Sequence, residues 1–261
     1  MAIYAVSDIH GYMNLFLKGL EEINFSDDDY LYVIGDAIDR GPDGIRLLQY
    51  IKEKDNMDLL IGNHEYLMLN SVSFRGLPFC TGSESTLWLD YNGGNITFEA
   101  YKELKERERK DLLEWLRSRI LIKKLEIDGK TIILTHSNYK PEFEGISYSE
   151  LYIEDVWNIV WQSMFRREIQ VRIDNIYKDY DATFVTGHVP VFRARDFWYK
   201  EGVPADEENV LAPLFAGNLI DIDGGCAAGT GLRAVNNGLL FLRLDDMKFF
   251  GVPMKKDTDM N

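Results

Sequence analysis

The chain has 261 residues, of which 46% are hydrophobic and 28% charged, a balance typical of a folded globular protein rather than a disordered or fibrous one. Its length suits one large domain with a substantial core, so we expect a single domain over residues 1–261. The 29 Lys and Arg against 43 Asp and Glu give a net charge of −14, which disfavours nucleic acid and anionic membranes as partners.

The N-terminal sequence MAIYAVSDIHG predicts a strand almost at once and has neither the basic nor the apolar region of a secretory signal. No apolar run approaches the roughly 18 residues of a membrane span. The two cysteines, Cys80 and Cys226, are far apart in sequence, which argues against a disulfide framework or a thiolate metal site. We therefore expect a cytoplasmic protein with reduced thiols.

Five short apolar runs each lead into a polar cluster: IYAVSDIH, YLYVIGDAID, MDLLIGNHE, TIILTHS and ATFVTGHV. Runs of this kind predict strands that are buried on both faces. Helical segments at about 13–22, 43–54 and 66–72 follow the first three runs, so the order is strand, helix, strand, helix, strand, helix. That order predicts parallel strands, and ligand sites in such sheets form at the carboxyl ends of the strands, where the polar clusters lie.

Residues 74–125 interrupt this alternation with a charged amphipathic stretch, and we predict an inserted helical cap there that influences which substrate is accepted. The mixed charges of the stretch are typical of a solvated helix face. After residue 181 the chain is rich in short strands, which predicts a second sheet stacked on the first. The predicted fold class is therefore α/β (α+β), two stacked mixed sheets flanked by helices.

All four histidines of the chain follow predicted strands, accompanied by carboxylates and an amide. One histidine at a strand end is more often a structural residue, but four out of four favour a metal site. Imidazole, carboxylate and amide ligands without thiolate suit Mn²⁺, Fe²⁺ or Zn²⁺. So many ligands can hold two ions, and a carboxylate can bridge them, a role for which Asp36 is the natural candidate because the other ligands flank it.

The motifs DIHG (8–11), GDAIDRG (35–41), GNHE (62–65), TH (135–136) and GHVP (187–190) occur in the order in which they occur in the calcineurin-like metallophosphoesterases. Among these enzymes the chain resembles the phosphoprotein phosphatases of bacteria and phages most closely. IDGG at 222–225 extends the resemblance weakly. The resemblance implies an α/β/β/α sandwich and a site with two divalent ions, for which we expect Mn²⁺, with Fe²⁺ and Zn²⁺ as alternatives.

Carried over residue by residue, the resemblance implies six metal ligands: Asp8, His10, Asp36, Asn63, His136 and His188. It further implies that His64 is the general acid, that Asp39 orients its ring, and that Arg40 binds the phosphate together with Asn63. Water activated by the ions would then attack phosphorus directly, without a covalent phosphoenzyme.

Three segments depart from the family pattern. HSN at 136–138 has serine where a small residue or glycine is common, and IDGG lacks the usual threonine. VWQSMFRRE places Ser163 where family members carry a second phosphate-binding arginine, so that Arg166 or Arg167 would have to supply it. WLDYNGG at 88–94 resembles a stretch near the substrate groove of bacterial and phage members, and a tight Asn-Gly-Gly turn explains it equally well.

The preferred function is that of a phosphomonoesterase acting on serine or threonine phosphoproteins, although a small phosphoester substrate is also open. The first alternative is a symmetrical dinucleoside polyphosphate hydrolase, a family in which asparagine precedes the arginine and aspartate follows GNH. Asp39 and Glu65 stand at those positions here and favour the phosphomonoesterase. The second alternative is a metal-binding relative without activity, for which only the loss of the second arginine argues.

Overall fold

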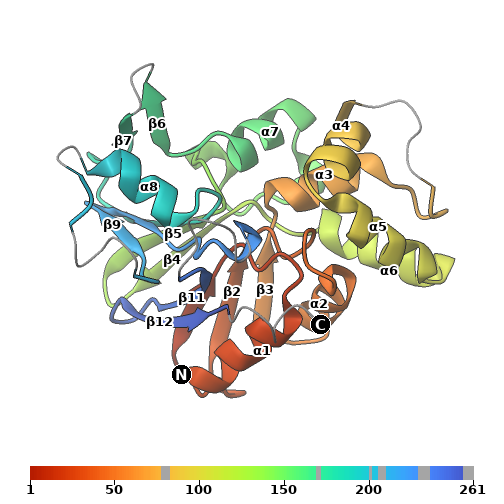
Figure 1. The fold of residues 1–261 in the computed structure, drawn as a ribbon, viewed down its shortest axis with the longest axis horizontal. Helices are drawn as coiled ribbons and strands as arrows, with labels where there is room; N and C mark the ends of the chain where they lie inside the picture. The colour runs from red at the N-terminus through yellow and green to blue at the C-terminus, as the bar shows by residue number, and fades with distance from the viewer. Residues whose placement is uncertain (78–82, 169–171, 200–201, 205–209, 229–235, 255–261) are drawn as a thin grey trace.

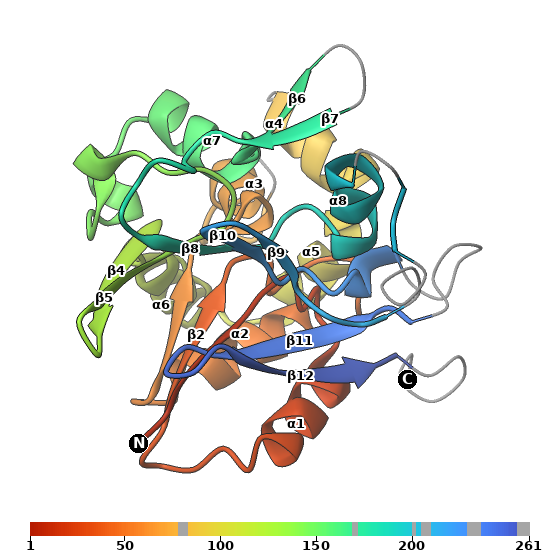
Figure 2. The ribbon, with the colours of Figure 1, turned by 90° about the vertical axis from the view of Figure 1, so that its left-hand side faces the viewer.

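The computed structural model describes residues 1–77, 83–168, 172–199, 202–204, 210–228 and 236–254, with the backbone alone at 83, 165–168 and 172–174. Within these ranges two mixed five-stranded β-sheets are stacked on each other and flanked by helices (Figure 1 and Figure 2). The predicted fold class, with its α/β/β/α layers, is confirmed.

The first sheet has the strand order β12-β11-β1-β2-β3, with β1, β2 and β3 parallel. Its strands are β1 (Ile3–Val6), β2 (Tyr30–Ile34), β3 (Met57–Leu60), β11 (Gly238–Arg243) and β12 (Lys248–Pro253). The helices that connect the parallel strands are α1 (Met13–Glu22) and α2 (Gly44–Lys52). Helix α1 occupies the predicted range and packs on β11 and β12, where Phe16 stacks on Phe241.

Helix α3 (Asn63–Ser71) begins three residues before the predicted range. The Glu65 carboxylate accepts a hydrogen bond from the Gly62 N–H at 3.0 Å, and this cap starts the helix directly behind β3. Asn63 and His64 therefore lie in the first helical turn, where their side chains have fixed directions.

The second sheet has the order β4-β5-β8-β10-β9, with β5, β8 and β10 parallel. Its strands are β4 (Ile122–Ile127), β5 (Lys130–Thr135), β8 (Thr183–Thr186), β9 (Leu214–Ala216) and β10 (Leu219–Asp221). Strands β5 and β8 carry the last two of the five predicted polar clusters, so the site is shared between the two sheets.

The prediction that the C-terminal strands belong to the second sheet is wrong for the last two of them. Strand β11 pairs antiparallel with β1, with Val6 opposite Phe241, and β12 pairs with β11. Residues 239–242 are fully buried, so β11 is a central strand of the first sheet, and β12 forms its edge (Figure 2).

Four helical elements follow α3 along the chain and precede β4: α4 (Ser83–Thr86), the π-helical turn η1 (Leu87–Tyr91), α5 (Gly94–Glu103) and α6 (Glu106–Arg117). The charged amphipathic stretch of the predicted cap forms two helices, α5 and α6, which are separated at Leu104 and Lys105, where ψ angles of about 150° are extended. Strand β4 begins at Ile122, inside the last residues of the predicted cap. The assignment of 74–125 to a cap within a single domain stays a prediction.

The remaining elements are η2 (Pro141–Phe143), η3 (Tyr148–Glu150), α7 (Ile153–Trp161), β6 (Phe165–Glu168), β7 (Arg172–Asn175), α8 (Val191–Trp198) and η4 (Cys226–Ala228). Helix α7 packs on α3, whereas α8 packs on β7 and β9. Cys226 is buried, and Cys80 lies outside the described residues. In the part of the chain described, no helix is long and apolar enough to span a bilayer.

Candidate metal centre and active site

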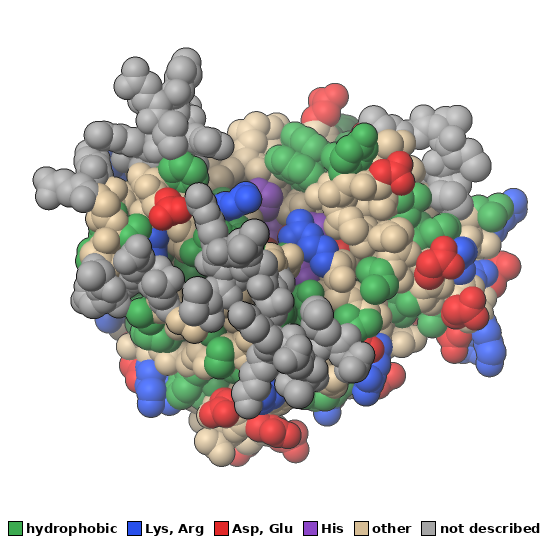
Figure 3. Space-filling view, viewed as in Figure 1, with side chains coloured by type: hydrophobic (Ala, Val, Ile, Leu, Met, Phe, Trp, Pro, Cys, Tyr) green, Lys and Arg blue, Asp and Glu red, His purple; other side chains and the backbone are tan. Residues whose placement is uncertain are grey.

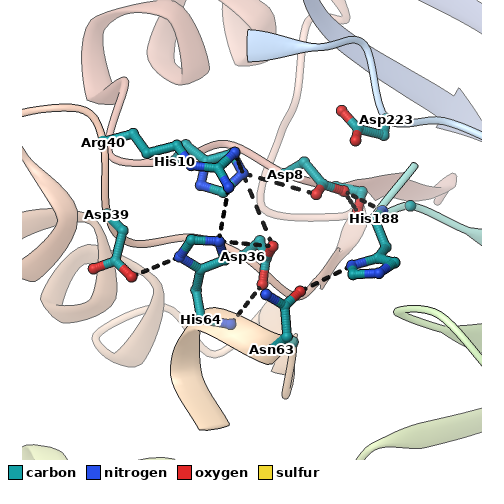
Figure 4. A network of polar contacts seen from close by, with 12 residues as sticks. Asp8, His10, Asp36, Asp39, Arg40, Asn63, His64, His188 and Asp223 are labelled. Carbon is teal, nitrogen blue, oxygen red and sulfur yellow. Dashed lines mark hydrogen bonds and ion pairs between the residues drawn. The ribbon is translucent and has the colours of Figure 1, made fainter. Parts of the chain in front are cut away.

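The structure brings all nine site residues predicted from the sequence into one cluster where the two sheets meet, and Figure 4 labels all of them except His136. They follow β1, β2, β3, β5 and β8: Asp8, His10, Asp36, Asp39, Arg40, Asn63, His64, His136 and His188. The candidates for a second arginine, Arg166 and Arg167, lie on β6, where the side chains are outside what the structure describes.

The backbone of the cluster is strained. Of the nine non-glycine residues with positive φ in the described ranges, six belong to the predicted site: Asp8, His10, Asp36, Asp39, Arg40 and His188. Residues other than glycine rarely adopt this conformation, which costs of the order of 1 kcal/mol or more for each of them. Strain concentrated in this way is typical of a functional site, because the fold must hold each side chain in one direction.

Two motif glycines allow the backbone to come close enough for this arrangement. A Cβ atom on Gly187 would collide with Ser7 and Asp8, and one on Gly62 would collide with Asp36. Glycine is therefore required at both positions because other chain segments occupy the space of a side chain.

His10 directs a lone pair toward two carboxylates. Its Nδ1 lies 3.0 Å from the Ile38 carbonyl oxygen and must donate there, so Nε2 carries the lone pair. Nε2 lies 3.9 Å from an oxygen of Asp8 and 3.9 Å from an oxygen of Asp36. Two carboxylates and an imidazole lone pair that face one point fit a metal ion, and the Arg40 guanidinium lies 3.3 Å from the same Nε2.

His136 repeats this arrangement on the other side of Asp36. Its Nδ1 donates to the Ile34 carbonyl at 2.9 Å, which leaves the Nε2 lone pair 2.9 Å from Asn63 Oδ1 and 3.5 Å from an oxygen of Asp36. His188 Nδ1 also lies 2.9 Å from Asn63 Oδ1. The His136 Nε2 lone pair and Asn63 Oδ1 are both electron-pair donors that would repel each other, and a cation between them would remove the repulsion.

Within the described ranges, two residue groups have ligand atoms close enough to hold an ion, and Asp36 belongs to both: His10, Asp36 and His64, and Asp36, His136 and His188. Glu65 fixes the Asp36 loop, because its carboxylate accepts hydrogen bonds from the N–H groups of Asp36 and Ala37 at 2.8 and 2.9 Å. This geometry suits the predicted bridging role of Asp36. The role of Glu65 was not anticipated from the sequence.

The electrostatics of the cluster also fit bound cations. Burial raises the pKa of Asp36 well above its usual value, and the Asp8 and Glu65 carboxylates raise it further. The pKa of Asp223, beside Asp8 and His188 in Figure 4, is likewise raised by burial and by Asp8. Buried carboxylates of like charge need compensation. Divalent ions in such a site supply water of lowered pKa and neutralise charge on a phosphoryl group.

His64 and Asp39 form a buried pair beside the metal ligands. His64 Nδ1 lies 2.6 Å from Asp39 Oδ2, and its Nε2 points to the cluster, 3.7 Å from Asp36 and 3.2 Å from the Arg40 guanidinium. Because Asp39 occupies Nδ1 and orients the ring, His64 fits the predicted acid better than a metal ligand, although it is near enough to Asp36 for either.

Trp88 is a member of the site that was not assigned a role from the sequence. It is fully buried in η1, and its Nε1–H donates to Asp39 Oδ2 at 2.7 Å. Trp88 belongs to the motif WLDYNGG, which the sequence explains equally well as a tight turn or as a stretch near the substrate groove. In the structure the motif forms a turn and also supplies this contact. The Gly93 carbonyl accepts from the Arg40 N–H at 3.3 Å, which ties the motif to a second site residue.

We expect Trp88→Phe to lower kcat by roughly 10-fold, because the ring remains while Asp39 loses a donor that orients it. Metal content and KM should change little, and the measurement is steady-state hydrolysis of a phosphomonoester at saturating Mn²⁺. Trp115→Phe on α6 is the matched control, since Trp115 does not line the cavity. An unchanged kcat in Trp88→Phe would show that the hydrogen bond from Trp88 to Asp39 does not contribute to catalysis.

A cavity of about 350 Å³ opens over the cluster, and histidines are visible in it in the space-filling view (Figure 3). Seven of the nine predicted residues line it, whereas Asp39 and His136 lie behind its wall. The other lining residues are Asn92, Trp161, Pro190, Phe192, Arg193, Asp223, Ala227 and Ala228. Of these, Pro190, Asp223, Asn92 and Trp161 fall within segments singled out from the sequence, whereas Phe192, Arg193, Ala227 and Ala228 do not.

Comparison with known families agrees with this geometry. A model of the calcineurin-like phosphoesterase family matches residues 1–221, and the chain belongs to that family. This places the chain among the enzymes that hydrolyse phosphoric ester bonds.

Similar proteins carry two kinds of name. The symmetrical bis(5'-nucleosyl)-tetraphosphatase of Nitrosospira multiformis is 25% identical, over 96% of this chain and 95% of its own. Its counterpart in Buchnera aphidicola is 29% identical over 65% of this chain, and the match spans only 57% of that enzyme. Serine/threonine-protein phosphatase 2 of Salmonella typhimurium is 28% identical, over 72% of this chain and 80% of its own.

Solved structures share the fold. A metallophosphoesterase from Sphaerobacter thermophilus superposes with a TM-score of 0.52 at 15% identity, covering 98% of this chain and 89% of its own. A serine/threonine phosphatase from Saccharomyces cerevisiae gives 0.51 at 14% identity, covering 98% and 82%.

Proposed function

We propose that the chain is a metal-dependent phosphomonoesterase that acts on phosphorylated serine or threonine in proteins, using two divalent ions, with Mn²⁺ preferred over Fe²⁺ and Zn²⁺. The six ligands are Asp8, His10, Asp36, Asn63, His136 and His188. The observation that carries this proposal beyond the family is the buried pair of Asp39 and His64, whose Nε2 faces the cluster.

The leaving group explains why this pair matters. Cleavage of a serine or threonine phosphate releases an alkoxide, a strong base that must be protonated as the bond breaks. Symmetrical cleavage of a dinucleoside tetraphosphate releases a nucleoside diphosphate, which is stable as an anion at neutral pH. A general acid that a buried carboxylate holds in place is therefore needed for cleavage of the monoester and contributes little to cleavage of the dinucleotide.

The two groups are suited to hold that proton. Burial and the Arg40 charge lower the pKa of His64, whereas burial raises the pKa of Asp39 to about 7. Together they can bind one proton near neutral pH, shared across the 2.6 Å contact. When the pair holds this additional proton, His64 carries hydrogen on both ring nitrogens, and its Nε2–H can pass to the departing oxygen. The Arg40 guanidinium, which lies 3.2 Å from Nε2, would then bind the phosphate oxygens, with the Asn63 amide beside them.

The second candidate is symmetrical dinucleoside polyphosphate hydrolysis. The relative from Nitrosospira multiformis, which carries that name, aligns with almost the whole chain. In addition, Trp161 and Phe192 line the cavity, and an aromatic wall is a suitable surface for a nucleobase. A small phosphoester would fit the same site.

The proposal is tested by measuring kcat/KM of the Mn²⁺-loaded protein for a phosphothreonine peptide and for diadenosine tetraphosphate. We expect the peptide to be preferred by at least about 10-fold, because only its leaving group needs the acid. Preference for the dinucleotide would favour the second candidate. Absence of hydrolysis of either substrate by protein that holds two ions would favour a relative without activity.

A further inference from the structure

Arg193 is a cavity residue to which neither the sequence motifs nor the proposed mechanism assigns a role. It stands in the first turn of α8, directly behind the His188 loop, and its exposed side chain lines the same cavity as Arg40. Figure 3 shows Lys and Arg side chains on both sides of the hollow in which the histidines are visible.

The neighbouring arginine of α8 shows what a structural arginine looks like in this helix. Arg195 is 3% exposed, and its guanidinium donates to the carbonyl oxygens of Val210 and Ala212 at 2.8 and 2.6 Å. It therefore anchors the segment that leads to β9. Arg193 makes no ion pair with any residue whose side chain the structure describes, so its charge is not used in the same way.

The distribution of charged side chains around the cavity indicates that Arg193 binds an anion. The carboxylates that line the cavity, Asp8, Asp36 and Asp223, lie on the side of the metal cluster, where cations compensate them. Among the lining residues that the structure describes, the only Lys or Arg side chains are those of Arg40 and Arg193. Arg40 approaches from the side of His10 and His64, at 3.3 and 3.2 Å from their Nε2 atoms, so it covers one side of a bound phosphoryl group.

We propose that Arg193 is the second phosphate-binding arginine, which contacts a non-bridging oxygen of the substrate's phosphoryl group from the α8 wall. A sphere of 350 Å³ is about 9 Å across, and an arginine side chain reaches its centre from the wall. Arg193 would thereby serve where Ser163 replaces the family arginine. The inference rests on the proposed function, because it assumes that a phosphate binds in this cavity.

Titration calorimetry of inorganic phosphate into Mn²⁺-loaded protein tests the proposal without relying on turnover. We expect Arg193→Ala to raise the Kd for phosphate by about 10-fold or more, the usual loss for a charge-assisted hydrogen bond. Arg193→Lys should recover part of the affinity, because it keeps the charge and loses the planar fork. Arg107→Ala, which removes an exposed charge from α6, should leave the Kd unchanged.

Variants of Arg166 and Arg167 test the other two candidates for the second phosphate-binding arginine. If Arg166→Ala or Arg167→Ala weakens phosphate binding and Arg193→Ala does not, the proposal is wrong. Absence of phosphate binding in the unsubstituted protein also overturns it. If the protein hydrolyses no monoester but Arg193→Ala still weakens phosphate binding at unchanged metal content and Tm, the role of Arg193 stands and the proposed function fails.

Discussion

Asp36→Asn should lower kcat by about 10³-fold or more and reduce the bound metal to fewer than two ions per chain. Asp36 is the one residue that the two candidate ligand groups share, and an amide cannot bridge two cations with two anionic oxygens. The same substitution should raise the Tm of the metal-free protein, because it removes a buried negative charge that Asp8 and Glu65 disfavour.

Loss of activity and of bound metal, together with a higher Tm of the metal-free protein, distinguishes an aspartate that bridges two ions from one that only stabilises the fold. Asp58→Asn is the control, since Asp58 pairs with Arg119 at 2.8 Å outside the cavity. It should retain two ions and full activity. Calorimetric metal titration and differential scanning calorimetry give the two readouts, and an Asp36→Asn protein that binds two ions with normal turnover would refute the bridging role.

The second large effect is expected from His64→Asn. Its kcat for a phosphothreonine peptide should fall by about 10²–10⁴-fold, the usual contribution of general acid catalysis. The loss for p-nitrophenyl phosphate should be much smaller, because nitrophenolate is a weak base and leaves without a proton. The comparison is made by steady-state kinetics at saturating Mn²⁺, with metal content measured on the same samples.

Asp39→Asn is the companion variant, because it keeps the shape of the side chain that holds His64 Nδ1 at 2.6 Å. It should show the same dependence on the leaving group with a smaller loss. Equal losses on both substrates, together with a missing ion in His64→Asn, would identify His64 as a metal ligand instead of the acid.

Much of the site could be predicted from sequence because it depends on local rules. Each predicted residue follows a short buried run, and the carboxyl ends of such strands meet at one edge. The Asp8 loop lies beside the Asp36 loop because β1 and β2 are adjacent and parallel, with Val6 opposite Val33. The range of α1 was also predictable, since its apolar positions repeat with helical spacing.

What could not be predicted depends on contacts between distant parts of the chain. The hydrogen bond from Trp88 to Asp39 spans 49 residues, and nothing in WLDYNGG identifies its acceptor. The pairing of β11 with β1 joins the two ends of the chain, and an apolar strand fits either sheet by composition alone. Arg193 resembles any exposed arginine until α8 brings it to the cavity.

The most direct test of the two-metal phosphomonoesterase is a stoichiometric titration. Metal-stripped protein receives Mn²⁺ in steps while hydrolysis of a phosphothreonine peptide is followed. We predict that activity is absent without metal and rises until two equivalents per chain have been added. Saturation at one equivalent, or activity that persists in the stripped protein, would contradict a catalytic centre in which Asp36 joins two ions.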